Sequence, residues 1–157
     1  MLQLLKEFLN EVGAGEKPAS RFSESDYRLA AAALLIHVMS IDGQDTGAEQ
    51  DKLHDLLKRQ FDLDDDAVSE LIAVATAADR EAVDLYAFTS RINRALDEDG
   101  RKRIVRMMGE MVYADGRLNE FEDNVVWRAS DLLGISQRDR VEMRREVAAT
   151  SQSRDDA

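Results

Sequence analysis

The sequence predicts an all-α protein, a single-domain bundle of about seven main helices preceded by an N-terminal amphipathic helix. Three observations lead to this fold class. One proline and eight glycines among 157 residues argue against an all-β chain, which needs many turn residues. Apolar residues recur at helical spacing along most of the chain. Capping signals, each with a cap residue three positions before an acidic residue, occur at Ser23-x-x-Asp26, Thr46-x-x-Glu49, Asn119-x-x-Glu122 and Ser136-x-x-Asp139.

The chain divides into four segments. Residues 1–12 are the predicted N-terminal helix, whose apolar stripe consists of Leu2, Leu5, Phe8, Leu9 and Val12. We expect this stripe to dock on the main domain. Alternatively, it binds a partner protein or forms a homodimer. Residues 13–22 lack periodicity and contain two glycines and the proline, which predicts a linker. Residues 23–149 are the helical domain, and the polar, aperiodic residues 150–157 are a predicted flexible tail.

Within the domain, each capping signal is followed by a helical pattern and the connections are short, which favours antiparallel neighbours. Asp64 is the expected cap of the helix that begins near residue 65. We expect helices at 24–41, 47–60, 65–78, 84–96, 98–114, 120–133 and 137–149. The apolar faces of these helices give the predicted core: Tyr27, Ala31, Leu34, Leu35, Val38, Ile41, Leu53, Leu56, Leu57, Phe61, Leu71, Ile72, Leu85, Phe88, Ile92, Leu96, Ile104, Met107, Met108, Met111, Val112, Val126, Trp127, Leu132 and Leu133.

Charge and composition exclude several functional classes. The net charge of −11 disfavours binding to nucleic acid and to anionic membranes, since both would repel the chain. The absence of cysteine excludes disulfides, thiol catalysis and thiolate metal sites. The longest apolar stretch, 29–39, is too short for a membrane span of about 20 residues. A soluble cytoplasmic protein without an organic cofactor is the expectation.

An internal repeat contains the most specific motif. Shifted by 73 residues, 34–43 aligns with 107–116, Glu49 with Glu122 and Leu53 with Val126; beyond this point the register slips by one residue, so that 61–64 aligns with 133–136. Each copy contains Asp-Gly-x5-Glu between two helices and ends with a short turn into a third. The repeat predicts two similar units related by a pseudo-twofold axis.

Helix capping explains part of this motif. Glycine is favoured just after a helix, and glutamate suits the first turn of the next one. Capping does not explain Asp42 and Asp115, because a carboxylate at a helix C-terminus faces the negative end of the helix dipole. A bound cation is one way to compensate for that arrangement.

Asp-Gly-x5-Glu is also the second half of an EF-hand loop, but the first half is absent. The first and third ligand positions would be Val38 and Ser40 in one copy, and Met111 and Tyr113 in the other. These side chains cannot supply carboxylates, so EF-hands are rejected. The remaining carboxylates suit Ca²⁺, Mg²⁺ or Mn²⁺, whereas zinc is disfavoured because His37 and His54 lack a zinc-site spacing.

The segment Met111-Val112-Tyr113-Ala114-Asp115-Gly116-Arg117-Leu118-Asn119-Glu120-Phe121-Glu122, followed by Leu132-Leu133-Gly134-Ile135-Ser136, resembles the signature of tellurite-resistance protein B-like (TerB-like) domains. The earlier turn, Ile41-Asp42-Gly43 to Glu49, fits the same family, and the resemblance covers roughly 24–149. It implies an all-helical, bacterial, cytosolic protein linked to tellurite and other stress responses, with no established enzymatic activity. It also implies a metal site at paired acidic residues, here Asp42, Glu49, Asp115 and Glu122.

Three functional hypotheses remain open. The first is a non-enzymatic stress-response or signalling module that binds a divalent cation and docks a protein partner. The second is a metal-dependent hydrolase that uses the acidic cluster. The third is a purely structural interaction domain in which the acidic residues are caps.

Other polar and aromatic residues have simpler interpretations. We expect His37 to be a partly buried polar residue rather than a ligand, and His54 to be solvated. The basic run formed by Arg101-Lys102-Arg103 with Arg106 is expected to be one solvated helix face, and Trp127 to lie in the core or in a groove wall.

Overall fold

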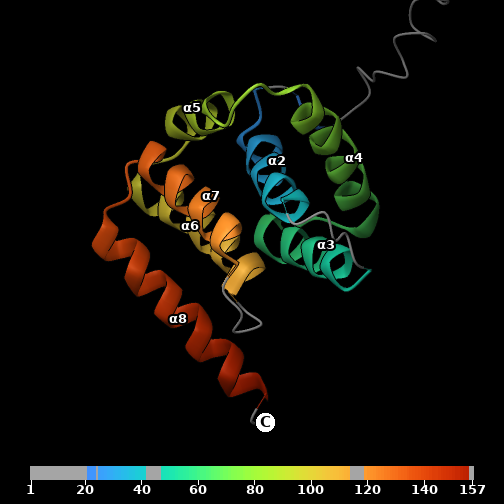
Figure 1. Ribbon diagram of the computed structural model, residues 1–157. Coiled ribbons are helices and arrows are strands. Elements are labelled where there is room, and N and C mark those ends of the chain that lie inside the picture. The colour runs from blue at the N-terminus through green and yellow to red at the C-terminus, as the bar shows by residue number, and fades with distance from the viewer. Residues whose placement is uncertain (1–20, 24, 42–46, 114–118, 156–157) are drawn as a thin grey trace, which may run out of the picture.

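The computed structural model describes residues 21–23, 25–41, 47–113 and 119–155, and all regular structure within them is helical. The helices of the described residues are α2 (Tyr27–Ser40), α3 (Gly47–Phe61), α4 (Asp65–Glu81), α5 (Tyr86–Ala95), α6 (Glu98–Tyr113), α7 (Glu120–Leu132) and α8 (Gln137–Asp155) (Figure 1). The all-α prediction is confirmed. The predicted helix at 1–12 and most of the predicted linker lie outside the described residues.

Helix α2 is the centre of the bundle and packs against α3, α4, α5, α6 and α7. Its sequence explains this position, because it is apolar on nearly every side, as expected of a helix buried all round. The four consecutive alanines at 30–33 are fully buried, and their small side chains allow neighbouring helices to approach closely.

Local capping fixes where several helices begin. The side chain of Asp64 accepts a hydrogen bond from the Ala67 N–H at 2.7 Å, as predicted for the start of α4. Asn119 Oδ1 accepts from the N–H of Phe121 at 2.9 Å, and Ser136 Oγ accepts from that of Asp139 at 3.1 Å. The predicted cap at Thr46 lies outside the described residues.

Several helix ends differ from the prediction; α4, for example, continues to Glu81 instead of ending at residue 78. Helix α2 begins at Tyr27 rather than at residue 24, because the side chain of Asp26 accepts from the Arg28 N–H and is itself the N-cap. The preceding residues form a turn in which the Asp26 N–H donates to the Ser23 carbonyl. Helix α8 continues to Asp155, past the end predicted at residue 149. Its polar last turns gave no periodic signal that would indicate this continuation.

The core assignment was right for most residues and wrong for Trp127 and Leu132, which are 41% and 40% exposed. Both lie on α7, where the apolar stripe is wider than the surface that neighbouring helices cover. Five other members of the predicted core are only partly buried: Tyr27, Ile41, Ile72, Leu96 and Met111. Phe22 was placed in the linker but is 3% exposed, with the Arg28 guanidinium 4.8 Å from its ring centroid.

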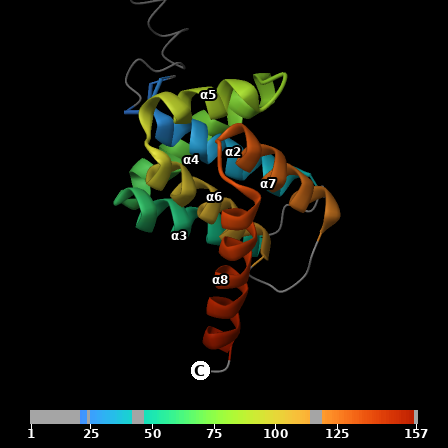
Figure 2. The same cartoon turned by 90° about the vertical axis from the view of Figure 1, so that its left-hand side faces the viewer.

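Helix α8 lies at the outside of the bundle, against α6 and α7, and its C-terminal end projects beyond the other helices (Figures 1 and 2). Close contact with α6 occurs at Gly109, where an added Cβ would overlap the sulfur of Met143. No helix among the described residues is both long enough and apolar enough to cross a membrane.

Candidate functional site

The structure describes two of the four predicted metal ligands. Glu49 lies in the first turn of α3 and Glu122 in the first turn of α7, and both are partly buried. One carboxylate oxygen of Glu49, Oε2, is inaccessible to solvent. The backbone N–H of Glu122 donates to the cap Asn119 at 3.2 Å. Asp42 and Asp115 lie outside the described residues.

Within the described ranges, no three acidic or histidine side chains are grouped closely enough to hold a metal ion. The four-carboxylate cluster therefore remains a prediction. The helices that flank the two acidic turns do lie together, since α2 packs against α6 and α7, and α3 packs against α6.

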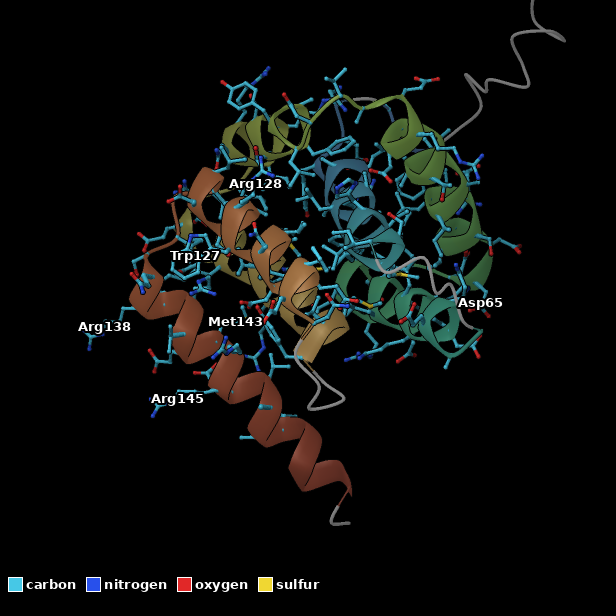
Figure 3. All side chains as sticks on the ribbon, in the orientation of Figure 1. Asp65, Trp127, Arg128, Arg138, Met143 and Arg145 are labelled. Carbon is cyan, nitrogen blue, oxygen red and sulfur yellow. The ribbon has the colours of Figure 1, made fainter. Side chains whose placement is uncertain are left out.

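A polar network that no sequence pattern signals lies where α6, α7 and α8 meet. At its centre, Asp123 accepts a short hydrogen bond from the Tyr113 hydroxyl. The Nη1 atoms of Arg144 and Arg140 lie 3.6 Å and 3.9 Å from Asp123 Oδ1. The guanidinium of Arg140 also stacks on the Trp127 ring, which Figure 3 shows between α7 and α8. The network therefore connects α8 to the residues on both sides of the second acidic turn.

Burial and charge explain the electrostatics of this network. Burial raises the pKa of the Tyr113 hydroxyl, and its hydrogen bond to the Asp123 carboxylate raises that pKa further. Tyr113 is therefore a neutral hydrogen-bond donor at physiological pH. Arg140 is 5% exposed, so its charge depends on Asp123 and on the indole face for stabilisation. Helical periodicity alone would have predicted an apolar residue at this position of α8.

The basic run on α6 is partly exposed, as predicted for a solvated face, but its side chains also pair with neighbouring helices. Lys102 Nζ lies 3.3 Å from Asp139 Oδ2, and Arg106 Nη1 lies 2.6 Å from Glu146 Oε2, so both bind α8. Arg101 donates to the Leu133 carbonyl, and Arg103 donates to the Gln60 carbonyl. These side chains connect α6 to its neighbours.

His37 is partly buried, as predicted, and its Nδ1 lies 2.9 Å from Asp79 Oδ1. The hydrogen bond to Asp79 raises the pKa of His37; burial and the charge of Arg128 act in the opposite direction. The pair links α2 to the last turn of α4. His54 was expected to be solvated but is partly buried, with Nε2 3.8 Å from Asp65 Oδ1.

Two cavities lie between helices of the described part. One, of about 370 Å³, lies between α6 and α8, and its rim is formed largely by the ion pairs of Lys102 and Arg106. The other, of about 380 Å³, lies between α2, α3 and α4. Its walls are Ile36, Met39, Ser40, Gln50, Leu53, Ile72, Thr76, Asp79 and Arg80.

Comparison with known proteins identifies the family. No curated protein and no solved structure matches the chain. The sequence model of the family "Tellurite resistance protein TerB" matches residues 28–145, which include α2 to α7 and the first half of α8. This match covers most of the chain and both acidic turns, so the protein belongs to the TerB tellurite resistance protein family.

Proposed function

We propose that this TerB-family protein is a non-enzymatic stress-response or signalling module that binds a divalent cation and docks a protein partner. Asp42, Glu49, Asp115 and Glu122 are the proposed ligands, and Ca²⁺, Mn²⁺ and Mg²⁺ are the candidate ions. The observation that carries the proposal is the direct packing of α2 on α6, together with the α2–α7 and α3–α6 contacts. This packing favours convergence of the two turns that follow α2 and α6.

The donor chemistry of the described ligands fits a hard cation. Carboxylate oxygens are the preferred ligands of Ca²⁺ and Mg²⁺. The solvent-inaccessible oxygen of Glu49 suits a ligand held in place by the fold rather than a freely solvated side chain. In a chain of net charge −11, a cation would also relieve repulsion among four acidic side chains.

Exposed side chains on α7 and α8 support the docking part of the proposal. Phe121 is 74% exposed and Val141 is 38% exposed. Arg138 and Arg145 point away from the bundle in Figure 3 and form no ion pair within the part of the chain that the structure describes. A partner captured by cross-linking with the wild-type protein should be lost from Phe121→Ser. Val83→Ser is the control, because Val83 is exposed but lies on the connection between α4 and α5 rather than on α7. Equal capture by both variants would contradict docking at α7.

Calorimetric titration of the full chain tests metal binding. We expect heat of binding and a rise in the melting temperature with at least one of the three ions at millimolar concentration. The double variant Glu49→Gln/Glu122→Gln should lose both signals, whereas the matched control Glu70→Gln/Glu142→Gln should keep them. Binding heat that is equal in the wild type and in the first double variant would exclude these glutamates as ligands.

The hydrolase hypothesis needs a separate assay. A metal-activated water at the cluster would hydrolyse an ester or phosphoester with Mn²⁺ or Mg²⁺ present. We expect no turnover above the rate of the metal ion alone. Turnover that disappears in Glu49→Gln/Glu122→Gln would replace the non-enzymatic proposal.

A further inference from the structure

We propose that the cavity between α2, α3 and α4 binds a phenolic ring, because the corresponding place between α6, α7 and α8 is filled by the Tyr113 side chain. This site is separate from the acidic turns and does not depend on the proposed cation.

Helices α4 and α8 correspond in sequence position and in packing. At the shift that aligns 61–64 with 133–136, Asp65 aligns with Gln137, the first residue of each helix. Their caps, Asp64 and Ser136, each accept from the N–H of the third residue on. The buried positions also align: Val68 with Arg140, Leu71 with Met143, and Ala75 with Val147. Helix α4 packs on α2 and α3, and its counterpart α8 packs on α6 and α7.

In the second half of the chain, Tyr113 fills the junction of its three helices and is 4% exposed. Its Cδ2 lies 3.5 Å from the point where a Cβ on Gly109 would be. Its hydroxyl donates to Asp123, and the guanidinium carbon of Arg144 lies 5.8 Å from its ring centroid. The Tyr113 side chain therefore lies beside one residue on each of α6, α7 and α8.

The same positions in the first half line the cavity. The shift of 73 residues pairs Gly109 with Ile36, Tyr113 with Ser40 and Asp123 with Gln50. After the one-residue slip, Arg144 pairs with Ile72. All four of these first-half residues belong to the wall of the cavity. The residue that replaces the tyrosine is a serine, and its hydroxyl donates back to the His37 carbonyl at 2.8 Å. A small side chain that bonds to its own helix leaves open the volume that the tyrosine ring occupies in the other unit.

The lining suits an aromatic ring with one polar end. Ile36, Met39, Leu53 and Ile72 supply apolar surface for a ring, whereas Thr76 and Asp79 supply oxygens on the α4 side. A phenol hydroxyl is a donor that a carboxylate accepts, as Asp123 does for Tyr113. The cavity volume of about 380 Å³ lies within the range of small-ligand sites, roughly 300–1,000 Å³.

Methyl-detected NMR of the full chain, with p-cresol as the probe, tests this assignment. We expect p-cresol to shift the methyl signals of Ile36, Leu53 and Ile72 in a saturable manner, while those of Ile104 and Ile135 stay unchanged. Toluene has the same ring without the hydroxyl, so we expect it to bind at least fivefold more weakly. An absence of saturable shifts at millimolar p-cresol would overturn the proposal, and equal binding of toluene would overturn the role of the hydroxyl.

Ser40→Tyr provides a second test, because it introduces the residue that stands at the corresponding position of the other unit. We expect this variant to have a higher melting temperature and to lose p-cresol binding. Ser25→Tyr is the matched control, since Ser25 is exposed and lies before the opposite end of α2. A folded Ser40→Tyr variant that binds p-cresol like the wild type would contradict the site; if the variant does not fold, the methyl map of the wild type still decides.

The source of the phenol is then distinguished with N-acetyltyrosinamide. Binding comparable to that of p-cresol would indicate a tyrosine side chain of a peptide or protein. Binding of p-cresol alone would indicate a free small phenol, because the peptide groups would not fit. Both outcomes support a phenolic site, whereas saturable binding of neither probe would exclude it.

Discussion

Arg140 and Trp127 form a stacked pair across the α7–α8 contact, with the guanidinium carbon 3.6 Å from the ring centroid. Arg140 is 5% exposed, and its Nη1 lies 3.9 Å from Asp123 Oδ1, too far for a direct hydrogen bond. The repeat register places Val68 at the corresponding position of α4. Helix α8 is thus attached through the buried charge of Arg140, at the position where α4 has the apolar side chain of Val68.

A double-mutant cycle at Asp123 and Arg140 tests this attachment. Asp123→Asn removes the carboxylate charge that accepts the Tyr113 hydrogen bond and faces Arg140 and Arg144. We expect it to destabilise the protein by about 1.5–3 kcal/mol, as for a hydrogen bond to a charged group. Arg140→Met in the same background removes the buried charge and should recover part of that loss. Urea unfolding of the wild type, both single variants and the double variant gives the coupling energy. Additive losses would show that the two side chains do not stabilise one another.

Local sequence signals predicted the helices well, because caps such as Asp64 and Asn119 act within four residues of themselves. The errors arose where the outcome depends on distant parts of the chain. The ion pairs of Lys102 and Arg106 were not predicted, because their acidic partners lie on α8, far along the sequence. Trp127 lies on an apolar stripe, but the position of α8 determines how much of that stripe is covered.

The candidate site was less predictable than the fold. The Asp-Gly-x5-Glu turns and the resemblance to TerB-like domains predict Asp42, Glu49, Asp115 and Glu122 as ligands, and only the two glutamates lie in the described residues. No comparable spacing signals the Tyr113–Asp123 bond, because any tyrosine ten residues before an aspartate would fit the same pattern. The bond forms because α6 and α7 pack together and bring these two side chains within reach.

The His37–Asp79 pair should make stability depend on pH in a specific direction. The hydrogen bond to Asp79 raises the pKa of His37 in the folded state, so protonation stabilises the fold. This contribution is complete below the unfolded-state pKa of about 6.5 and is lost as the pH rises through the folded value. The melting-temperature difference between wild type and Asp79→Asn should therefore be larger at acidic than at alkaline pH. The His37 ring-proton titration should also have a lower midpoint in Asp79→Asn; an unchanged midpoint would contradict the assigned cause.

Core truncations should separate the fully buried positions from the partly buried ones. Leu34 is fully buried on the central helix, so Leu34→Ala should cost about 2–5 kcal/mol, as large-to-small core changes do. Met111 only packs against the edge of the core, so Met111→Ala should cost less. Urea denaturation of both variants measures the two losses. An equal or larger loss at Met111 would show that the apolar face of α6 is more deeply buried than this structure has it.

The two acidic turns distinguish cation binding from capping through the stability of the metal-free protein. If the four carboxylates converge, Glu49→Gln/Glu122→Gln relieves repulsion, and the metal-free variant should be as stable as the wild type or more stable. If the glutamates only favour the starts of α3 and α7, the same changes should each cost about 0.3–1 kcal/mol, because they remove negative charge from a helix N-terminus.

Added Ca²⁺, Mn²⁺ or Mg²⁺ should raise the melting temperature of the wild type at neutral pH, and should do so less at acidic pH, where protons compete for the carboxylates. Chemical denaturation in a chelator, followed by thermal melts with each ion, measures both effects. A stability loss in the variant together with no thermal shift for any ion in the wild type would identify the glutamates as caps and remove the cation from the proposed function.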